Sequence, residues 1–298
     1  MIYVVGHIVY DHIFKVDSLP EPDSARPVRE YKEFFGGGAG NFAMVCSKLN
    51  QKTSLISVVG EDFRNSDYEK NLKLNGIELK HLKYIRGERT ASAYIANDCK
   101  KHQISLFYWG AAEFFNRFEV PKLKFGDGDL LHISSGHPKF NYRIARNYPR
   151  ISFDVGQDIV IYKKKNLEDI FYNTRFLFCN EFELKRILEK TTLKNVSNLF
   201  EYGIEYVIVS NGSKGSIILT KKEKIKIPAL RVKVVDPTGA GDAHRAALLT
   251  SFLKGLSLEM CGKVAASVAS FIIEKDGAQT NMPTWSMAIN RLKKAKIA

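Results

Sequence analysis

The sequence predicts an α/β protein built on a mostly parallel sheet with helices packed against it. Short apolar runs recur through the 298 residues, and segments with helical spacing separate most of them. This alternation favours a parallel sheet, because crossover helices usually join parallel strands. Two of the runs end at glycines, Gly6 and Gly60, as is typical where a buried strand passes into a loop.

The elements follow in order along the chain. The expected buried strands are Ile2–Val5, Thr53–Val59, Leu130–Ile133, Ile151–Val155, Phe176–Cys179 and Tyr206–Val209. The expected helices are Gly40–Leu49, Phe63–Asn75 with Gly76 at its end, Leu167–Tyr172, Glu181–Leu188 and the Ala/Leu run after Asp242. Ser216–Thr220 and Lys224–Ile227 flank Lys221-Lys-Glu223 and predict a hairpin.

Two stretches, residues 12–35 and about 88–108, alternate apolar and polar residues without helical spacing. Thr90–Ala96 and Gln103–Tyr108 read as paired strands around a turn near Lys100-Lys101. The pattern alone fits either an edge hairpin of the main sheet or a small β-sheet that stands apart.

Composition places the chain among large globular proteins, with 45% hydrophobic residues. The longest apolar candidate, Ser257–Ile273, contains Glu259 and Lys263, so we expect no membrane span. The start, Met1-Ile-Tyr-Val-Val-Gly6, lacks a basic segment, and we expect a cytoplasmic protein without a signal peptide. The cysteines are far apart and form no Cys-x-x-Cys, so neither a disulfide framework nor a zinc site is expected.

A formal net charge of +13 fits either nucleic acid or a small anionic ligand. The lysines are spread along the chain, and their short runs are not interleaved with aromatic residues as in a base-stacking surface. Nucleic-acid binding is therefore not expected as the main function.

The residues Asp236-Pro-Thr-Gly-Ala-Gly-Asp-Ala-His-Arg-Ala-Ala-Leu248 are the most informative part of the chain. Small residues at 239–241 let the backbone approach a ligand, and the positive end of the following helix favours an anion. Asp242 stands where it could accept a proton from a hydroxyl group. An anion site beside a base is what phosphoryl transfer to an alcohol requires. A generic Gly-x-Gly-Asp is also an ordinary helix start with an acidic cap.

Other polar groups follow strands or open helices. Gly36-Gly-Gly-Ala-Gly-Asn41 opens a helix but lacks the Lys-Ser/Thr of a P-loop, and Asp11 closely follows the first strand. Asn180-Glu-Phe-Glu183 and Ser210-Asn-Gly212-Ser-Lys-Gly215 each follow a later strand, where ligands gather in α/β sheets. Taken singly, these segments also fit a turn residue, a helix cap or a hairpin turn.

Together these motifs resemble the two signatures of the ribokinase-like (PfkB) family of sugar and nucleoside kinases. The resemblance implies a three-layer αβα core from residues 1–11, 36–87 and 112–298. It also implies a β lid from residues 12–35 and 88–111 over the acceptor site. It assigns catalysis to Asp242, as base, with Gly239, Ala240 and Gly241 as the anion hole.

The resemblance also implies binding roles. The acceptor would lie against Asp11, Gly36, Gly37, Asn41, Phe107 and Gln157. ATP would lie against Asn180, Ser210, Gly212, Gly215, Gly277 and Ala278. Asn180 and Glu183 would organise Mg²⁺ largely through water, and K⁺ near the Asp236 loop is a further candidate cofactor. Members occur as monomers and as homodimers paired through the lid.

Several segments are most similar to bacterial and archaeal adenosine and nucleoside kinases. Gln103-Ile-Ser-Leu-Phe-Tyr-Trp-Gly-Ala111 resembles their lid segment, and Asp154-Val-Gly-Gln157 resembles another of their motifs. An aromatic lid suits a flat nucleobase, although strand alternation lets only some of its side chains face inward. His244, Ala247 and Trp109 depart from the usual Phe, Gly and Pro.

The expected reaction is therefore ATP-dependent phosphorylation of a ribose 5′-hydroxyl. The alternatives are a sugar or sugar-phosphate kinase and, in another class, a non-catalytic nucleotide- or RNA-binding protein on a kinase fold.

Overall fold

A computed structural model describes residues 1–100 and 102–295. The main sheet has nine strands, and all of its pairings are parallel except the two at one edge, β11–β12 and β12–β13. In spatial order the strands are β13 (Lys224–Ile227), β12 (Ser216–Leu219), β11 (Tyr206–Ser210), β10 (Thr174–Asn180), β9 (Ile151–Asp154), β8 (Leu130–Ile133), β1 (Ile2–Val5), β4 (Thr53–Gly60) and β5 (Glu78–Ile85).

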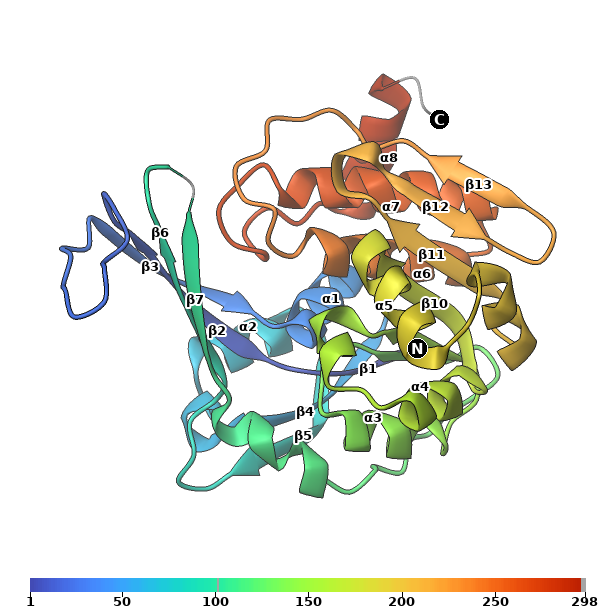
Figure 1. Cartoon of the computed structure of the whole chain (residues 1–298), viewed down its shortest axis with the longest axis horizontal. Coiled ribbons are helices and arrows are strands. Elements are labelled where there is room, and N and C mark those ends of the chain that lie inside the picture. Colours follow the sequence, from blue (N-terminus) through green and yellow to red (C-terminus); the bar gives the residue numbers. More distant parts are fainter. Residues whose placement is uncertain (101, 296–298) are drawn as a thin grey trace.

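Helices cover both faces of this sheet, which gives the three-layer αβα arrangement visible in Figure 1. The α-helices are α1 (Gly38–Lys48), α2 (Asp67–Leu74), α3 (Pro138–Ala145), α4 (Lys164–Phe171), α5 (Glu181–Thr191), α6 (Ala240–Leu253), α7 (Leu258–Ile272) and α8 (Trp285–Lys294). Shorter 3-10 helices are η1 (Glu61–Phe63), η2 (Gly110–Arg117), η3 (Gly156–Val160), η4 (Val196–Tyr202) and η5 (Gly212–Lys214).

The side chains of β1 show how one strand supplies both layers. Ile2 and Val4 pack into a core shared with α1, α2, α6, α7 and α8. Tyr3 and Val5 pack into a second core with α3, α4 and η2. All four side chains are buried, as expected for a central strand covered on both faces.

A four-stranded sheet stands apart from the main sheet, and its strands project at the left of Figure 1. Its order is β3 (Glu30–Gly36), β2 (Val9–Lys15), β6 (Ser92–Asn97) and β7 (Gln103–Tyr108). The expectation of a separate small sheet is confirmed. The predicted turn between β6 and β7 includes Lys101, which lies outside the described residues.

The small sheet extends slightly further than the boundaries expected for the lid. Its strand β2 begins at Val9 and so includes Asp11, and β3 continues to Gly36. Asp11 therefore lies on a lid strand, paired with Phe34 of β3 and Ala93 of β6.

The predicted helix Phe63–Asn75 is too long. The structure has η1, a break around Asn65, where φ is positive, and then α2 from Asp67 to Leu74. Ser66 caps α2 by accepting a hydrogen bond from the Glu69 backbone N–H.

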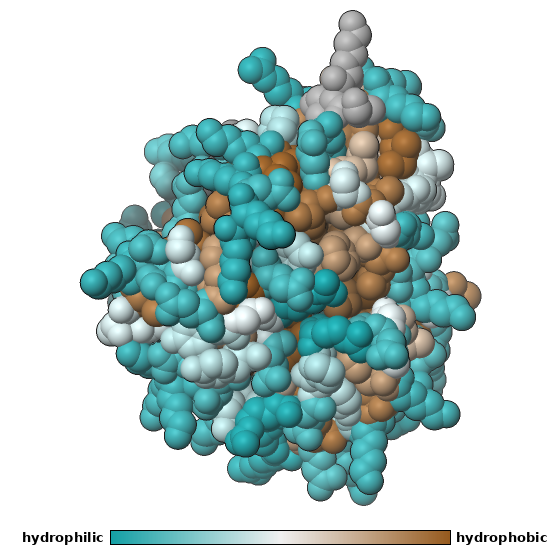
Figure 2. Space-filling view, turned by 90° about the vertical axis from the view of Figure 1, so that its right-hand side faces the viewer, coloured by the Kyte–Doolittle hydropathy of each residue, from teal (hydrophilic) through white to brown (hydrophobic). Residues whose placement is uncertain are grey.

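In the part of the chain that the structure describes, no helix is long and apolar enough to span a membrane. The face shown in Figure 2 has hydrophilic residues around most of its outline and a band of hydrophobic residues in its middle.

Candidate active site

The Asp236 carboxylate fixes the turn before α6 through two backbone hydrogen bonds. One carboxylate oxygen of Asp236 accepts the Thr238 N–H at 2.9 Å, and the other accepts the Gly277 N–H at 2.9 Å. Gly239 caps α6 with φ of 78°, a conformation that favours glycine, and a Cβ at this position would collide with Ala278. The chain needs glycine here for both reasons.

The first turn of α6 presents free backbone donors. Among the described residues, the N–H groups of Gly239, Gly241 and Asp242 have no backbone acceptor, whereas Ala240 donates to the Pro237 carbonyl at 3.2 Å. The helix end adds its partial positive charge to these donors. An anion therefore fits at this turn, although the Ala240 N–H is already engaged.

Two cavities meet at this turn. The larger, about 670 Å³, is lined by Thr238, Gly239, Asp242 and Arg245, and the smaller, about 530 Å³, by Pro237, Ala240, Gly241 and His244. The same helix end thus forms part of the wall of each. The backbone N–H groups that lack a backbone acceptor in the described part of the chain, those of Gly239, Gly241 and Asp242, therefore belong to residues that line one cavity or the other.

The larger cavity gathers most of the residues predicted to hold the acceptor. It is lined by Asp11, Gly37, Asn41, Phe107 and Gln157. Gly36 does not line it but lies directly behind Asp11, because a Cβ at Gly36 would collide with the Asp11 carboxylate.

The lid strand β7 contributes alternate side chains to this cavity. Ser105 and Phe107 of β7 line it, as does Trp109 directly after the strand, whereas Leu106 and Tyr108 do not. The rings of Phe107 and Trp109 meet edge to face with centroids 4.8 Å apart. Trp109, in place of the usual Pro, therefore adds a second aromatic ring to the cavity wall.

Both carboxylate oxygens of Asp242 have partners. Oδ2 accepts a hydrogen bond from Asn41 Nδ2 at 2.9 Å, and Oδ1 accepts one from Arg245 Nη2 at 2.7 Å. Gln279 donates to the Asn41 side-chain oxygen at 3.0 Å and so fixes the orientation of that amide. The proposed base and the residue expected to hold acceptor hydroxyls are thus in direct contact.

Acidic groups crowd the larger cavity. Burial, then the nearby charges of Asp242 and Asp236, raise the pKa of Asp11 to about 7. Burial also raises the pKa of Asp154 to about 7, although the Arg245 guanidinium opposes that shift. Burial raises the pKa of Asp158 to about 6. Carboxylates on this side of the site therefore titrate near neutral pH.

Asn180 and Glu183 form a capping box at the start of α5. Asn180 Oδ1 accepts the Glu183 N–H at 2.8 Å, and Glu183 Oε2 accepts the Asn180 N–H at 2.8 Å. Glu183 lines the larger cavity, whereas Asn180 lines neither cavity. No cluster of three metal-binding side chains occurs within residues 1–100 and 102–295.

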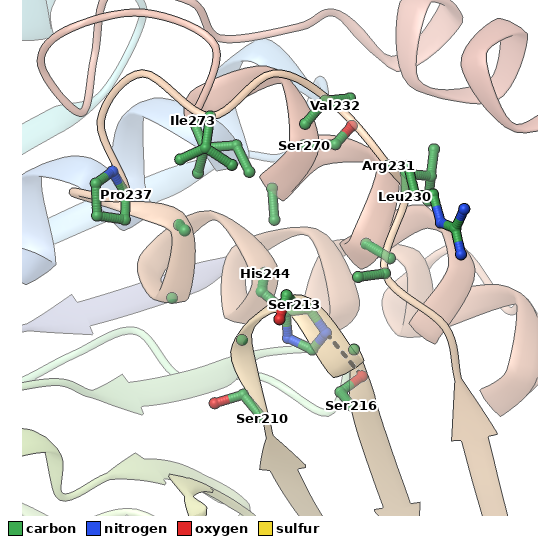
Figure 3. Close-up of a pocket in the computed structure, with 18 residues that line it drawn as sticks. Ser210, Ser213, Ser216, Leu230, Arg231, Val232, Pro237, His244, Ser270 and Ile273 are labelled. Atoms are coloured by element: carbon green, nitrogen blue, oxygen red, sulfur yellow. Dashed lines mark hydrogen bonds between the residues drawn. The ribbon is translucent and has the colours of Figure 1, made fainter.

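The smaller cavity has mostly apolar walls. Figure 3 shows Val232 and Ile273 across the space from Ser210 and Ser216. Gly212 and Gly215 also line it, and both have positive φ. Gly215 closely approaches the strand-end backbone at Ile227, which leaves no room for a side chain.

His244 belongs to the smaller cavity. Its Nε2 lies 3.1 Å from Ser216 Oγ (Figure 3), and burial together with the neighbouring Arg245 lowers its pKa to about 4. The imidazole is therefore neutral near pH 7. Ala247, the second departure on this helix, is fully buried in the core.

Gly277 and Ala278 do not line the smaller cavity, contrary to expectation. They lie against the turn before α6: the Gly277 N–H donates to Asp236, and Ala278 packs against Gly239. A side chain at Gly277 would collide with the Phe34 ring of β3.

Sequence reasoning missed the link between Arg245 and Asp154. Arg245 Nη2 lies 2.9 Å from Asp154 Oδ2 as well as 2.7 Å from Asp242 Oδ1. The position of Arg245, three residues after Asp242 on one helix, was a usable signal for the second contact. No local signal indicates the first contact, which joins α6 to the end of β9.

Comparison with known proteins decides the family. Residues 1–285 match the pfkB family of carbohydrate kinases. The chain belongs to this family. It is therefore a phosphotransferase that uses an alcohol acceptor, which agrees with an anion site beside a carboxylate.

Among relatives, the chain is 40% identical to the nucleoside kinase of Methanocaldococcus jannaschii over 98% of this chain and 97% of the relative. It is 39% identical to the nucleoside kinase of Methanothermobacter thermautotrophicus over 96% of this chain and 94% of that one. Both alignments span nearly the whole chain and so include the core and the lid.

Solved structures show the same fold. The crystal structure of the M. jannaschii nucleoside kinase, described as an archaeal member of the ribokinase family, superposes with a TM-score of 0.94 at 40% identity, covering 98% of both chains. The ribokinase of Thermotoga maritima superposes with a TM-score of 0.82 at 26% identity, covering 98% of this chain and 99% of that one. The ribokinase-like fold expected from the sequence is confirmed.

Proposed function

We propose that this kinase transfers the γ-phosphoryl group of ATP to the ribose 5′-hydroxyl of a nucleoside, in the manner of an adenosine kinase. The observation that carries this proposal is the position of Asp242 and the free N–H groups of α6 between two cavities, one of them walled by the aromatic rings of Phe107 and Trp109. The archaeal relatives at 40% and 39% identity, both named nucleoside kinases, support the choice of acceptor.

The acceptor would occupy the larger cavity. Asp11 and Asn41 offer hydrogen-bonding groups to the ribose hydroxyls, and Gly37 allows the sugar to approach the backbone. Phe107 offers a flat face to the base, and Gln157 is an exposed amide at the cavity wall. With a nucleoside bound, the lid would exclude water from this cavity, which would favour transfer over hydrolysis of ATP.

Asp242 would accept the proton of the 5′-hydroxyl as that oxygen attacks the γ-phosphorus. The Gly239 and Gly241 N–H groups and the α6 dipole would stabilise the charge on the moving phosphoryl group. Ala240 contributes less, because its N–H already donates to Pro237.

ATP would occupy the smaller cavity, with Ser210, Gly212 and Gly215 near its phosphates and the apolar walls around its base. Glu183 fits a role in holding Mg²⁺, because it lines the neighbouring cavity while only its Oε2 is engaged by the Asn180 N–H. Mg²⁺ keeps most of its waters, so few protein ligands suffice, and it neutralises phosphate charge when bound with ATP. K⁺ near the Asp236 loop is a further proposal, from the family resemblance alone.

The test is ADP release from MgATP with adenosine, inosine, guanosine, cytidine, uridine, ribose and fructose 6-phosphate as acceptors, with Asp242→Asn as control. We expect turnover with nucleosides and its loss in the control. Nucleosides should also raise the unfolding temperature, because a ligand that binds the folded state stabilises it. Turnover with sugars alone would keep the kinase and overturn the nucleoside assignment.

The basic surface gives a second candidate function a specific basis. With a formal net charge of +13, RNA binding without catalysis is the alternative. No turnover with any acceptor, together with RNA binding that weakens steeply with salt, would favour it.

A further inference from the structure

One guanidinium joins two carboxylates from different elements of the site. Arg245, on the first turns of α6, places Nη2 at 2.7 Å from Asp242 Oδ1 and at 2.9 Å from Asp154 Oδ2, at the end of β9. The exposed fractions of the three side chains are only 18% for Arg245, 15% for Asp242 and 3% for Asp154. This is a largely buried ionic triad at the wall of the acceptor cavity.

Stability alone explains this triad poorly. Buried ion pairs rarely stabilise a fold more than apolar residues of the same size, because the desolvation cost offsets the Coulomb attraction. Arg245 Nε and Asp154 Oδ1 are also buried without a hydrogen-bond partner among the described residues, which adds to that cost. A chain that needed only packing here would be better served by apolar side chains.

The triad does determine how Asp242 is held. Arg245 engages Oδ1 while Asn41 engages Oδ2, so the plane of the carboxylate is fixed from both sides. Asp154 in turn holds the guanidinium by the same Nη2 that meets Asp242. The two carboxylates therefore hold the guanidinium at the side of Asp242.

The surrounding charges make that guanidinium necessary. Asp11, Glu183 and Asp154 are acidic neighbours of this end of the site, and His132 and His244 beside Arg245 are held neutral by burial. Arg245 is the one cationic side chain among the residues that line the larger cavity in the described chain. It is therefore the positive charge that faces these carboxylates on the cavity wall.

We propose that Arg245 is a positioning residue that holds the Asp242 carboxylate oriented for proton transfer, and that Asp154 is the carboxylate that keeps Arg245 in place. This proposal rests on the proposed role of Asp242 as the base. It extends the active site to the end of β9, which sequence patterns did not connect to the catalytic turn.

The experiment compares the pH dependence of kcat/KM for wild type, Arg245→Gln, Arg245→Lys and Asp154→Asn, with MgATP and a nucleoside acceptor. The acid limb is the part of each profile where kcat/KM falls as the pH is lowered. Loss of the cation in Arg245→Gln should move this limb to higher pH by about one to two pH units. Loss of the competing carboxylate in Asp154→Asn should move it to lower pH. Arg245→Lys keeps the charge but loses the fork geometry, so its limb should stay in place while kcat falls about 10-fold.

Opposite movement of the two limbs is a result that a merely structural role would not produce. An unchanged limb in Arg245→Gln, or movement of both limbs in one direction, would overturn the proposal. If Arg245→Gln does not fold, an Asp154→Asn limb at lower pH together with an unmoved Arg245→Lys limb supports the proposal, and an Asp154→Asn limb that is unchanged or at higher pH overturns it. Asp242→Asn separates the two proposals: retained turnover there refutes the base itself, whereas its loss with unchanged Arg245 and Asp154 limbs refutes only the triad.

Discussion

The two cavities that share the α6 turn differ in chemistry. The smaller is walled largely by aliphatic side chains and glycines, and the pKa of its histidine is lowered to about 4, so that histidine is neutral. The larger is lined by Asp11, Asp154, Asp158, Glu183 and Asp242, with a single guanidinium among them. The difference predicts that binding in the smaller cavity depends on its shape, on backbone donors, on serine hydroxyls and on Arg231, none of which titrates near neutral pH. The larger cavity should therefore carry most of the pH dependence and most of the discrimination between ligands.

The largest expected effect lies at the junction of the cavities. Asp242→Asn removes a proton acceptor while keeping the shape and the hydrogen bond to Asn41 in reach, so kcat should fall about 10²–10⁴-fold. Steady-state ADP release measures this, and the unfolding temperature shows that the fold is kept. Full activity in a folded variant would exclude Asp242 as the base.

The aromatic wall of the larger cavity should account for recognition of the base. Phe107→Ala should raise the KM of a nucleoside about 10–100-fold, because stacking on an aromatic ring contributes about 1–3 kcal/mol per base. Tyr108→Ala is the matched control: Tyr108 is the next residue of β7, with similar exposure (44% against 41%), but it does not line the cavity. Equal effects of the two substitutions would contradict the assignment of Phe107.

The larger cavity should also make stability depend on pH. The pKa of Asp11 is raised to about 7 in the folded protein, so between about pH 4 and pH 7 only the folded state keeps this proton. The resulting contribution to the free energy of unfolding is complete below about pH 4 and is lost as the pH rises through 7. Asp11→Asn should therefore gain about 1–3 kcal/mol over wild type between pH 5 and pH 8 in denaturant unfolding. The exposed Asp127→Asn serves as control, and a gain of the same size there would refute the buried-carboxylate explanation.

The smallest effect is expected in the smaller cavity. His244→Phe removes one neutral hydrogen bond to Ser216, so the free energy of unfolding should fall by only about 0.5–1.5 kcal/mol. The KM for ATP should show no new pH dependence between pH 6 and 8, because the histidine is already neutral there. The opposite result would be a wild-type KM for ATP that changes steeply between pH 6 and 8 and a variant KM that does not. It would show that the smaller cavity also contributes to the pH dependence.

Features that are local in sequence were predictable, and features that depend on distant partners were not. The turn at Gly239, the capping box at Asn180 and the buried strands each carry their signal within a few residues. β5 was missed because Leu79, Leu82 and Ile85 recur at a spacing of three, which resembles a helix, and only pairing with β4 makes this segment a strand. The expected helix from Phe63 ran through Ser66 because its apolar spacing outweighed the local signal of the Ser66 N-cap, where α2 begins.

The candidate site shows the same limit. The sequence placed Asp11, Asn41, Phe107 and Gln157 in one group, and they line one cavity. It did not indicate that Asn41 binds Asp242, because that hydrogen bond spans 201 residues of chain and depends on how α1 packs against α6. Gly277 and Ala278 were expected to contact ATP, whereas they lie against the turn at Gly239 and do not line the smaller cavity.

The first turn of α6 lines both cavities, and this has a consequence for inhibitor design. A nucleoside joined to an adenine nucleotide through a phosphate chain could reach both cavities at once across the Gly239–Gly241 backbone. The second half of such a bivalent compound would bind at a high effective concentration once the first is bound. Its affinity would peak at the chain length that matches the crossing, so a series of tethers would act as a molecular ruler for the path of the transferred phosphate.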